Sequence, residues 1–488
     1  MPFAQVGFLL GRALLLLAAV EIMPLLVAWG HGERHAVRGF ALGLLLSAFA
    51  GGLLLLTFRG NTRPAHKRDV LLFALIGWLV LAFFAAMPIL ITGAVPRFHD
   101  AYFEALSGLT TTGASILSDV ESMPRAILIW RALLSALGGL IVIVLALVVT
   151  PVFNVGGAAL TRNLLPEGEG ESIPTRLRGV MRSLAPIYGL LILFCMLALT
   201  AAGMPFFDAL CHAMGAISTS GFSTRNQSIA AFDSAAIEMV LVPFMLMGAL
   251  NFTYHWALLK GRTRHLRRDH EVLGYLMLIG VGVLVVATGA LAWLHARGVS
   301  FGLWESLRTA LFTTVSAATT TGFAGAAAAP LTLLGVYVLT ALVFAGGVTG
   351  SASGGLKIMR VILLIRHAGR ELARLVHPRG VVVVRFNGAV VNDNALIGVW
   401  TLYILLLASI AFLSMAFAAV GADLSTSFFL SLSAITNSGP VISILDPVFA
   451  GFPALGPGAQ WIYCIGMVLG RMETVAVLVV FSASFWRN

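Results

Sequence analysis

Charged residues are scarce in this chain. Asp, Glu, Lys and Arg make up only 11% of its 488 residues, whereas hydrophobic residues make up 59%. An average soluble domain carries roughly 25% charged residues, which cover its surface. A soluble helical protein of this length would also need polar helix faces and longer hydrophilic loops. The composition therefore excludes a soluble globular protein and indicates one that resides in a membrane.

Cysteine and recognisable catalytic groups are scarce as well. Cys195, Cys211 and Cys464 lie in or beside apolar runs, and their spacing fits no metal site. We expect three small buried hydrophobic residues rather than a disulfide. The sequence contains no recognisable nucleophile–base pair, phosphate-binding loop or metal-ligand cluster, so it does not indicate an enzyme.

Long apolar runs fill most of the sequence. A helix of about 20 apolar residues spans a bilayer, and the first run is too long for a cleavable signal. The sequence therefore predicts an all-α polytopic membrane protein. We expect ten transmembrane helices, near residues 6–29, 39–58, 70–93, 127–153, 183–203, 235–259, 272–296, 331–365, 394–419 and 457–485.

The net charge of +10 is concentrated in few places. Basic residues gather in four short segments, near 59–68, 162–182, 260–268 and 357–385. Pairs of predicted crossings separate these segments, so all four lie on one side, which the positive-inside rule identifies as the cytoplasm. Both termini are then cytoplasmic. The rule accounts for the basic residues without nucleic acid as a partner, although RNA binding by the last segment is the alternative.

Four shorter apolar segments do not fit as crossings. They lie near 99–112, 206–220, 303–321 and 424–438, and each runs into a patch of polar residues around one glycine. We name the patches in chain order: patch 1 is TTTGAS at 110–115, patch 2 is STSGFS at 218–223, patch 3 is TTTGFA at 319–324 and patch 4 is TNSGPV at 436–441. Short apolar helices that end in irregular backbone are typical of re-entrant elements.

The order helix, half-helix, patch, helix occurs four times. Acidic residues, which suit a helix N-terminus, open the half-helices: Asp100 and Glu104, Asp208, Glu305, and Asp423. We predict a two-helix N-terminal segment, 1–68, followed by four pseudo-symmetric pore repeats around a central ion pore. The predicted repeats are 69–160, 161–268, 269–385 and 386–488.

Irregular backbone at membrane depth must be buried or line a water-filled path. Glycine permits a left-handed turn there, and four such segments around one axis can direct carbonyl oxygens at a potassium ion. The predicted filter residues are Thr111, Thr112, Gly113, Thr219, Ser220, Gly221, Thr320, Thr321, Gly322, Asn437, Ser438 and Gly439. Small residues also mediate helix packing in membranes, which is an alternative for one patch but does not explain four.

The run FAGGVTGSASGGLKIMR, 344–360, interrupts the eighth predicted crossing. Each interior glycine costs a helix about 1 kcal/mol relative to alanine. We therefore expect a broken helix with a flexible loop at 346–355 below the patches and Lys357 at its cytoplasmic end. The candidate gate residues are Gly346, Gly347, Gly350, Ser351, Ser353, Gly354, Gly355, Lys357 and Arg471. A nucleotide site at these glycines is a weak alternative, because no strand precedes them.

Arg471 and Glu473 interrupt the last predicted crossing. Charged side chains inside a membrane are costly and usually functional. We expect Arg471 to face the pore and to meet either the glycine-rich loop or Glu473. The alternative is a purely structural pair.

Taken together, these motifs resemble the TrkH-type subunits of bacterial Trk potassium uptake systems, within the Trk/Ktr/HKT superfamily. The resemblance rests on the four patches, on GGVTGSASGGLKIMR and on the ending LGRMETVAVLVVFSASFWR, and it covers essentially the whole chain. It implies channel-like potassium uptake across a bacterial inner membrane, one filter glycine in each patch, a gating loop at 346–355 and a pore arginine at Arg471. The run SASGGLK replaces a more usual STGGGIK-like run, which predicts a stiffer gate.

The resemblance also implies partners. It implies a homodimer within membrane lipid and a cytosolic TrkA-like subunit whose nucleotide-binding domains sense NAD and ATP, with potassium as substrate and no cofactor. Two other functions stay open at this point. A proton- or sodium-coupled secondary transporter would predict paired halves and carboxylates at the membrane midplane, and a receptor-like or structural membrane protein would leave the patches unexplained.

Overall fold

The computed structural model describes residues 2–60, 67–153, 173–261, 269–297, 302–325, 331–380 and 382–472. Across these ranges the chain is mostly helical, which confirms the all-α fold class. The described ranges also contain one short antiparallel hairpin, β1 (Arg385–Phe386) with β2 (Ala389–Val390). The sequence did not predict this hairpin, which follows the last basic segment.

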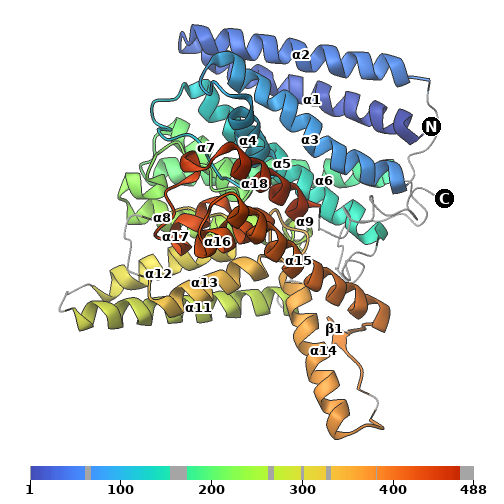
Figure 1. Ribbon diagram of the computed structural model, residues 1–488, viewed down its shortest axis with the longest axis vertical. Coiled ribbons are helices and arrows are strands. Elements are labelled where there is room, and N and C mark those ends of the chain that lie inside the picture. The colour runs from blue at the N-terminus through green and yellow to red at the C-terminus, as the bar shows by residue number, and fades with distance from the viewer. Residues whose placement is uncertain are drawn as a thin grey trace.

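The helices follow the predicted order. The N-terminal segment contains α1 (Pro2–Gly30) and α2 (Arg34–Phe58), which pack against each other beside the pore repeats (Figure 1). Repeat 1 contains α3 (Lys67–Thr92), α4 (Phe98–Leu109) and α5 (Arg125–Phe153). Repeat 2 contains α6 (Ile173–Ala201), α7 (Phe206–Ile217), η2 (Ser228–Phe232), α8 (Ala235–Ala249) and α9 (Phe252–Leu259).

The second half of the chain has the same plan. Repeat 3 contains α11 (His270–Ala296), α12 (Leu303–Ala318), α13 (Leu333–Ala345) and α14 (Ile358–Val376). Repeat 4 contains α15 (Asp393–Ala419), α16 (Leu424–Ile435), η3 (Gly439–Val441), α17 (Ile442–Leu445), η4 (Phe452–Ala454) and α18 (Pro457–Arg471). The half-helices α4, α7, α12 and α16 are the four short segments predicted from the sequence.

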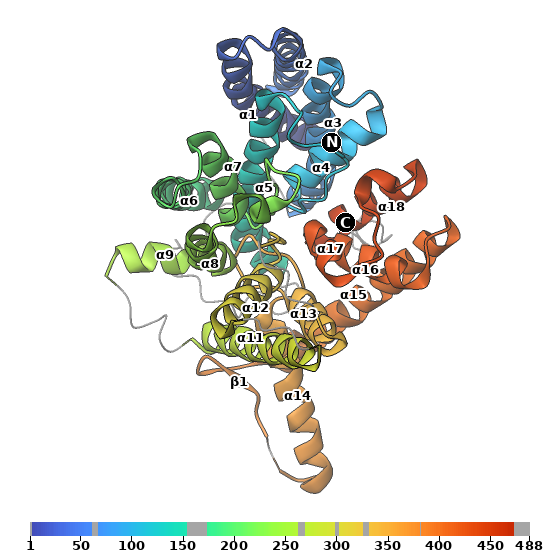
Figure 2. The same ribbon diagram turned by 90° about the vertical axis from the view of Figure 1, so that its left-hand side faces the viewer.

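The four repeats surround a common centre (Figure 2). Helix α5 of repeat 1 contacts α7 of repeat 2, and α8 of repeat 2 contacts α12 of repeat 3. The ring continues from α13 to α17 and closes between α18 and α4. Because each repeat contacts the next and the last contacts the first, the half-helices and their patches come together although they are far apart in the sequence.

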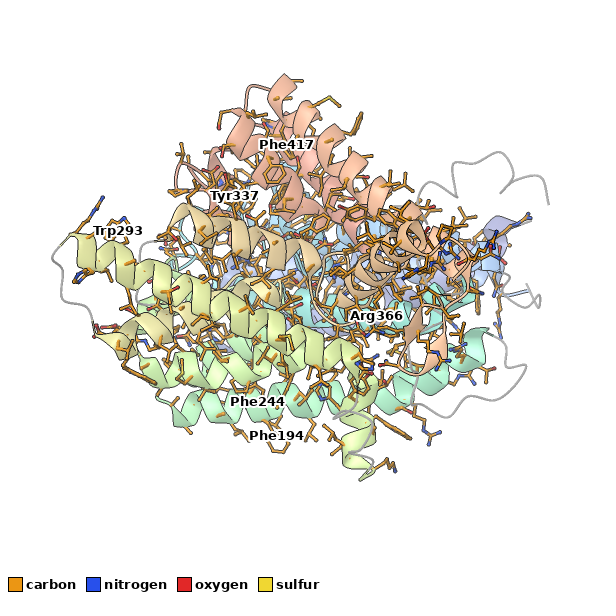
Figure 3. The ribbon with its side chains drawn as sticks, turned by 90° about the horizontal axis from the view of Figure 1, so that it is seen from below. Phe194, Phe244, Trp293, Tyr337, Arg366 and Phe417 are labelled. Atoms are coloured by element: carbon orange, nitrogen blue, oxygen red, sulfur yellow. The ribbon has the colours of Figure 1, made fainter. Side chains whose placement is uncertain are left out.

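Burial distinguishes the centre from the periphery. On α4 every residue from Ala101 to Leu109 is buried, whereas the long outer helices expose large apolar side chains such as Phe49 and Met277. Phe194 and Trp293 project from outer helices at the edge of the molecule (Figure 3). Extensive apolar surfaces are unfavourable in water, so this distribution is that of a protein surrounded by lipid.

The number of crossings stays a prediction. Within the described ranges, seven helices are long and apolar enough to span a membrane, and the bent pair α8–α9 makes up to eight. The other two predicted crossings are α13–α14, which the glycine-rich loop interrupts, and α18. Helix α18 ends at Arg471, and the rest of the predicted crossing lies outside the described residues.

The sixth predicted crossing, 235–259, is not one helix. It breaks after Ala249, and α9 leaves at 102° to α8. The Asn251 side chain caps α9 by accepting a hydrogen bond from the Thr253 amide at 2.9 Å. The break frees the carbonyl oxygens of Gly248 and Ala249, which accept hydrogen bonds from the amides of Ala352 and Val348. The glycine-rich loop thus occupies the break, a contact that local sequence does not reveal.

Helix α14 extends beyond the predicted crossing, which was expected to end near 365. It continues to Val376 and projects away from the rest of the molecule (Figure 1). It exposes the apolar side chains of Ile365, Leu372, Leu375 and Val376, and Arg370 donates a hydrogen bond to Asp393 at the start of α15.

Candidate functional site

The four patches meet around one centre. A Cβ atom on Gly113 would lie 1.6 Å from the Ser220 carbonyl oxygen, and one on Gly221 would lie 1.9 Å from that of Thr321. A Cβ atom on Gly322 would approach Pro440 at 3.0 Å, and one on Gly439 would approach the Ala114 amide at 2.5 Å. Each glycine therefore packs against the next patch, and patch 4 returns to patch 1. The absence of a side chain at these glycines is what allows the ring to close.

The backbone has the same shape at the same point of each patch. Four non-glycine residues, each two positions before the patch glycine, have a left-handed backbone: Thr111, Thr219, Thr320 and Asn437, with φ of 50°, 55°, 58° and 48°. A left-handed conformation costs a non-glycine residue roughly 1–2 kcal/mol. Strain of this kind tends to occur at functional sites, where the surrounding structure holds it in place.

The half-helix in front of each patch holds this shape. In each repeat, the amide of the residue before the patch glycine donates a hydrogen bond to the carbonyl oxygen of the residue five positions earlier, in the half-helix. The pairs, at 2.9–3.0 Å, are Thr112 to Ser107, Ser220 to Gly215, Thr321 to Ser316, and Ser438 to Ser433. These bonds are typical of a helix C-terminus that ends in a left-handed turn. The amides of these patch residues are therefore paired within their own half-helix, and several patch carbonyl oxygens receive no hydrogen bond from the described residues.

Four of these carbonyl oxygens occupy equivalent positions in the four repeats. Within the described residues, the carbonyl oxygens of the left-handed residues Thr111, Thr219, Thr320 and Asn437 accept no hydrogen bond, and all four residues are fully buried. A buried acceptor without a donor is costly. A cation that sheds its water offers such oxygens a compensating partner. The donor set consists of neutral oxygens, which suits a monovalent ion rather than a divalent one.

Most patch hydroxyls brace the backbone. Thr110 and Thr112 pair at 2.8 Å, Thr319 and Thr321 at 2.8 Å, and Thr436 and Ser438 at 2.7 Å. Patch 2 lacks this pair. There the side-chain oxygens of Thr219 and Ser220 are buried and have no hydrogen-bond partner among the described residues. The threonine-rich composition of the patches thus reflects internal bracing in three of the four repeats.

Patch 4 departs from the expected symmetry. Gly113, Gly221 and Gly322 have φ of 75°, 71° and 82°, but Gly439 does not have a left-handed backbone, contrary to expectation. Instead Gly439 opens the 3₁₀ helix η3, in which Pro440 follows, and its amide donates to the Thr112 carbonyl oxygen at 2.7 Å. Proline has a fixed φ and favours the first turn of a helix. Pro440 was the sequence signal for this difference.

The glycine-rich loop, 346–355, packs directly against the patches. The Gly354 amide donates to Thr320 Oγ1 at 2.9 Å, and a Cβ atom on Gly354 would lie 1.7 Å from the Thr436 carbonyl oxygen. Gly346, Gly350 and Gly355 have left-handed backbones, with φ of 67°, 81° and 79°. The loop therefore reaches the underside of patches 3 and 4 through contacts that only glycine permits.

The sequence placed Lys357 at the cytoplasmic end of the broken segment; the structure places it between the glycine-rich loop and α14. It is buried, and its Nζ folds back to donate to the Ser353 carbonyl oxygen and, at 3.4 Å, to Ser351 Oγ. Its own backbone is left-handed, with φ of 78°. Gly354, Gly355 and Leu356 precede this lysine, and the tight turn directs its ammonium group into the loop.

Arg471 reaches both the loop and patch 1. Its Nη1 donates to the carbonyl oxygens of Ala352 at 2.9 Å and Ser353 at 3.5 Å. Its Nε and Nη2 contact the Thr110 carbonyl oxygen and the Thr111 hydroxyl. Glu473, the other partner considered, lies outside the described residues.

Two buried carboxylates were not anticipated as parts of the site. Glu104, taken as a helix-opening acid, is fully buried and contacts Arg131 on α5. Glu271 at the start of α11 accepts hydrogen bonds from the Thr349 amide at 2.7 Å and the Met359 amide at 3.1 Å. Both lie in predominantly apolar helices. The presence of a charged residue in such a helix was the only feature of the sequence that could have identified them as parts of the site.

The fold and the ring of patches can now be compared with known proteins. A protein-family model described as TrkH, cation transport protein, matches residues 37–488. This chain belongs to the TrkH family. The family consists of transport proteins, so this member is a transport protein rather than an enzyme.

TrkH-family relatives match along the whole chain. The Trk system potassium uptake protein TrkH of Halomonas elongata is 34% identical over 98% of both chains, and its Escherichia coli K12 counterpart is 33% identical over 100% of both. The crystal structure of the potassium transporter TrkH from Vibrio parahaemolyticus superposes with a TM-score of 0.91 at 30% identity, over 100% of both chains. The likeness therefore includes α1, which lies before the region that the family model matches.

Proposed function

We propose that this TrkH-family protein carries potassium into the cell through a channel-like pore whose selectivity filter is formed by the four patches. The supporting observation is the ring of buried, unpaired carbonyl oxygens at Thr111, Thr219, Thr320 and Asn437. Such oxygens replace the hydration shell of a potassium ion. The relatives at 33–34% identity carry potassium uptake in their names, which agrees with this substrate.

The glycine-rich loop is the proposed gate. It packs against patches 3 and 4 on one side, and Arg471 joins it to patch 1. Its dense glycines allow a change of backbone shape at low steric cost. In the proposed closed state the loop blocks the path below the filter, and opening requires it to move away from Thr320 and Thr436, which Gly354 contacts.

The proposed setting is a bacterial inner membrane with both termini in the cytoplasm. The basic segments support this orientation, and the membrane potential supplies about 2.3 kcal/mol per charge per 100 mV for inward movement of a cation. The name Trk system, which the relatives carry, agrees with association with further subunits. The proposed partners are a second copy of this chain and a cytosolic nucleotide-binding subunit. The projecting, arginine-rich end of α14 offers such a subunit a basic surface.

The second candidate function is a proton- or sodium-coupled transporter. Coupling of this kind usually places an ionisable carboxylate in the path. Glu104, the buried carboxylate that contacts patch 1, is already paired with Arg131, and Glu271 is held by hydrogen bonds from the Thr349 and Met359 amides. We therefore favour the uncoupled pore.

Ion flux into liposomes tests the proposal. We expect reconstituted protein to pass potassium and rubidium faster than sodium and lithium, and to keep doing so when proton and sodium gradients are collapsed. Flux that stops with either gradient would instead support the coupled transporter. Shortening 346–355 by two residues should raise the flux, and an unchanged flux would remove the loop from the gate.

A further inference from the structure

A buried ion pair lies beside the last residues of patches 1 and 2, just after the patch glycines. Glu104 on α4 is fully buried, and Arg131 on α5 is 3% exposed. The Arg131 Nε atom lies 2.5 Å from Glu104 Oε1. Helix α5 contacts both α4 of its own repeat and α7 of the next (Figure 2). The arginine therefore comes from the element that lies between the two half-helices.

The pair binds patch 1 through its outer end. Glu104 accepts hydrogen bonds from Ser115 Oγ and from the Ile116 amide, both at 3.0 Å. Arg131 Nη2 also donates to Ser115 Oγ at 3.0 Å. These contacts begin two residues after Gly113, so they hold the backbone just beyond the predicted filter residues of this patch.

The same arginine binds patch 2 at the equivalent point. Its Nη1 donates to the Ser223 carbonyl oxygen at 3.2 Å, and its guanidinium carbon lies 4.3 Å from the centre of the Phe222 ring. Ser223 stands two residues after Gly221, as Ser115 stands after Gly113. One guanidinium thus connects two patches from different repeats at matching positions.

The other repeats have no such charge at this position. The residues that take the place of Glu104 relative to the patch glycine are His212, Thr313 and Leu430. His212 contacts the residue that follows its own patch glycine by two positions, since its Nε2 lies 2.9 Å from Ser223 Oγ. Patches 2 and 3 are joined by a backbone hydrogen bond from Ala230, after patch 2, to Ala324, and patches 4 and 1 by one from Gly439 to Thr112. An ion pair between Glu238 on α8 and Arg308 on α12, at 3.0 Å, also joins repeats 2 and 3, but its arginine is 15% exposed, whereas Arg131 is 3% exposed.

We propose that Glu104 and Arg131 are positioning residues for ion selectivity, which fix the spacing of patches 1 and 2. This inference rests on the proposed filter. Unpaired carbonyl oxygens that face one another repel, so their spacing must be held from behind if a potassium-sized site is to be preferred. Hydrogen bonds to charged groups are the strongest available, and the planar guanidinium adds a fixed geometry that lysine cannot reproduce.

Arg131→Lys tests the geometry separately from the charge. The ammonium keeps the positive charge beside Glu104 but cannot reach Glu104, Ser115 and Ser223 together. We expect the potassium-to-sodium flux ratio in liposomes to fall about tenfold, the equivalent of one lost hydrogen bond to a charged group. Potassium flux itself should continue. Glu104→Gln should lower the ratio in the same direction, because it weakens the hold on Ser115 and Ile116.

Asn226→Ala is the matched control. Asn226 joins the same two outer segments at an exposed position, accepting from the Val120 amide at 2.7 Å and donating to Asp119 at 2.9 Å. Its loss should leave the flux ratio unchanged. A ratio that falls equally in Asn226→Ala and Arg131→Lys would overturn the proposal, because any link between the segments would then suffice.

A second measurement guards against variants that fold poorly. The rise in melting temperature caused by potassium, relative to sodium, reports ion preference in purified protein without transport. It should shrink in Arg131→Lys while the melting temperature without ions stays within a few degrees. An unchanged preference in both assays would overturn the proposal. The proposed filter itself fails only if Gly113→Ala also leaves ion preference unchanged, so the two failures are distinguishable.

Discussion

The guanidinium of Arg471 donates a hydrogen bond of 2.9 Å to the carbonyl oxygen of Ala352. The same side chain contacts the carbonyl oxygen and hydroxyl of two patch 1 residues, Thr110 and Thr111. One arginine therefore joins the glycine-rich loop to the ring of patches. Any movement of the loop must break these contacts, so the cost of opening the proposed gate depends on them.

Arg471→Gln should make the gate easier to open. The substitution removes charge-assisted hydrogen bonds to Ala352 and Ser353 that are worth roughly 1.5–3 kcal/mol each when intact. We expect potassium flux into liposomes to rise about tenfold, the equivalent of about 1.4 kcal/mol. Arg370→Gln is the control, because its partner Asp393 lies on α15 away from the patches. A flux that is unchanged or lower in Arg471→Gln would contradict the role assigned to this contact.

Gly113→Ala should abolish selective flux. Its Cβ atom would lie 1.6 Å from the Ser220 carbonyl oxygen, so patches 1 and 2 could not both keep their positions. Gly93→Ala is a matched control, since Gly93 has φ of 76° but nothing within 4 Å of the added atom. It should cost only the left-handed strain of about 1–2 kcal/mol.

Comparison of Gly113→Ala with Gly93→Ala separates the effect of backbone strain from that of crowding between patches. Both variants should be measured by thermal unfolding and by ion flux. If Gly93→Ala disturbs ion preference as much as Gly113→Ala does, the effect comes from backbone strain in general and not from the ring of patches.

Thr320→Val should loosen the glycine-rich loop. Valine keeps the shape and backbone of threonine but loses the Oγ1 that accepts from the Gly354 amide at 2.9 Å. Because the amide stays buried without a partner, we expect the closed arrangement to lose about 1–3 kcal/mol and the flux to rise. Thr219→Val is the control: Thr219 has the equivalent left-handed backbone, and its Oγ1 has no partner among the described residues. Equal flux in the two variants would show that the Gly354 contact does not restrain the gate.

Glu271→Gln should also release the loop, from its other side. One carboxylate oxygen accepts hydrogen bonds from the Thr349 amide, the Thr349 hydroxyl and the Met359 amide, and so joins the loop to the start of α14. A neutral amide oxygen is the weaker acceptor, because charge-assisted bonds are roughly twice as strong. We expect higher potassium flux together with a lower melting temperature.

Glu33→Gln is the control for this change. Glu33 likewise accepts two amides, from Arg125 at 2.8 Å and Ala126 at 3.2 Å, at a helix start remote from the loop. It should lower the melting temperature slightly and leave flux unchanged. If Glu271→Gln lowers stability without altering flux, Glu271 has a structural role only.

Local sequence determined the segments of this protein. Apolar length predicted the long helices and the short half-helices, because the cost of leaving apolar groups in water acts on each segment alone. The sequence also predicted the patches and the break in the helix at 346–355, since dense glycine and hydroxyl residues are unusual inside such helices.

Tertiary structure alone decided how these segments meet. The bend after Ala249 exists because the glycine-rich loop satisfies the carbonyl oxygens that it frees. Glu104 pairs with Arg131 through a contact between α4 and α5. The different backbone of Gly439 allows patch 4 to bond to patch 1 and close the ring. Hydrogen bonds between residues hundreds of positions apart depend on packing geometry, which the pattern of a single segment does not contain.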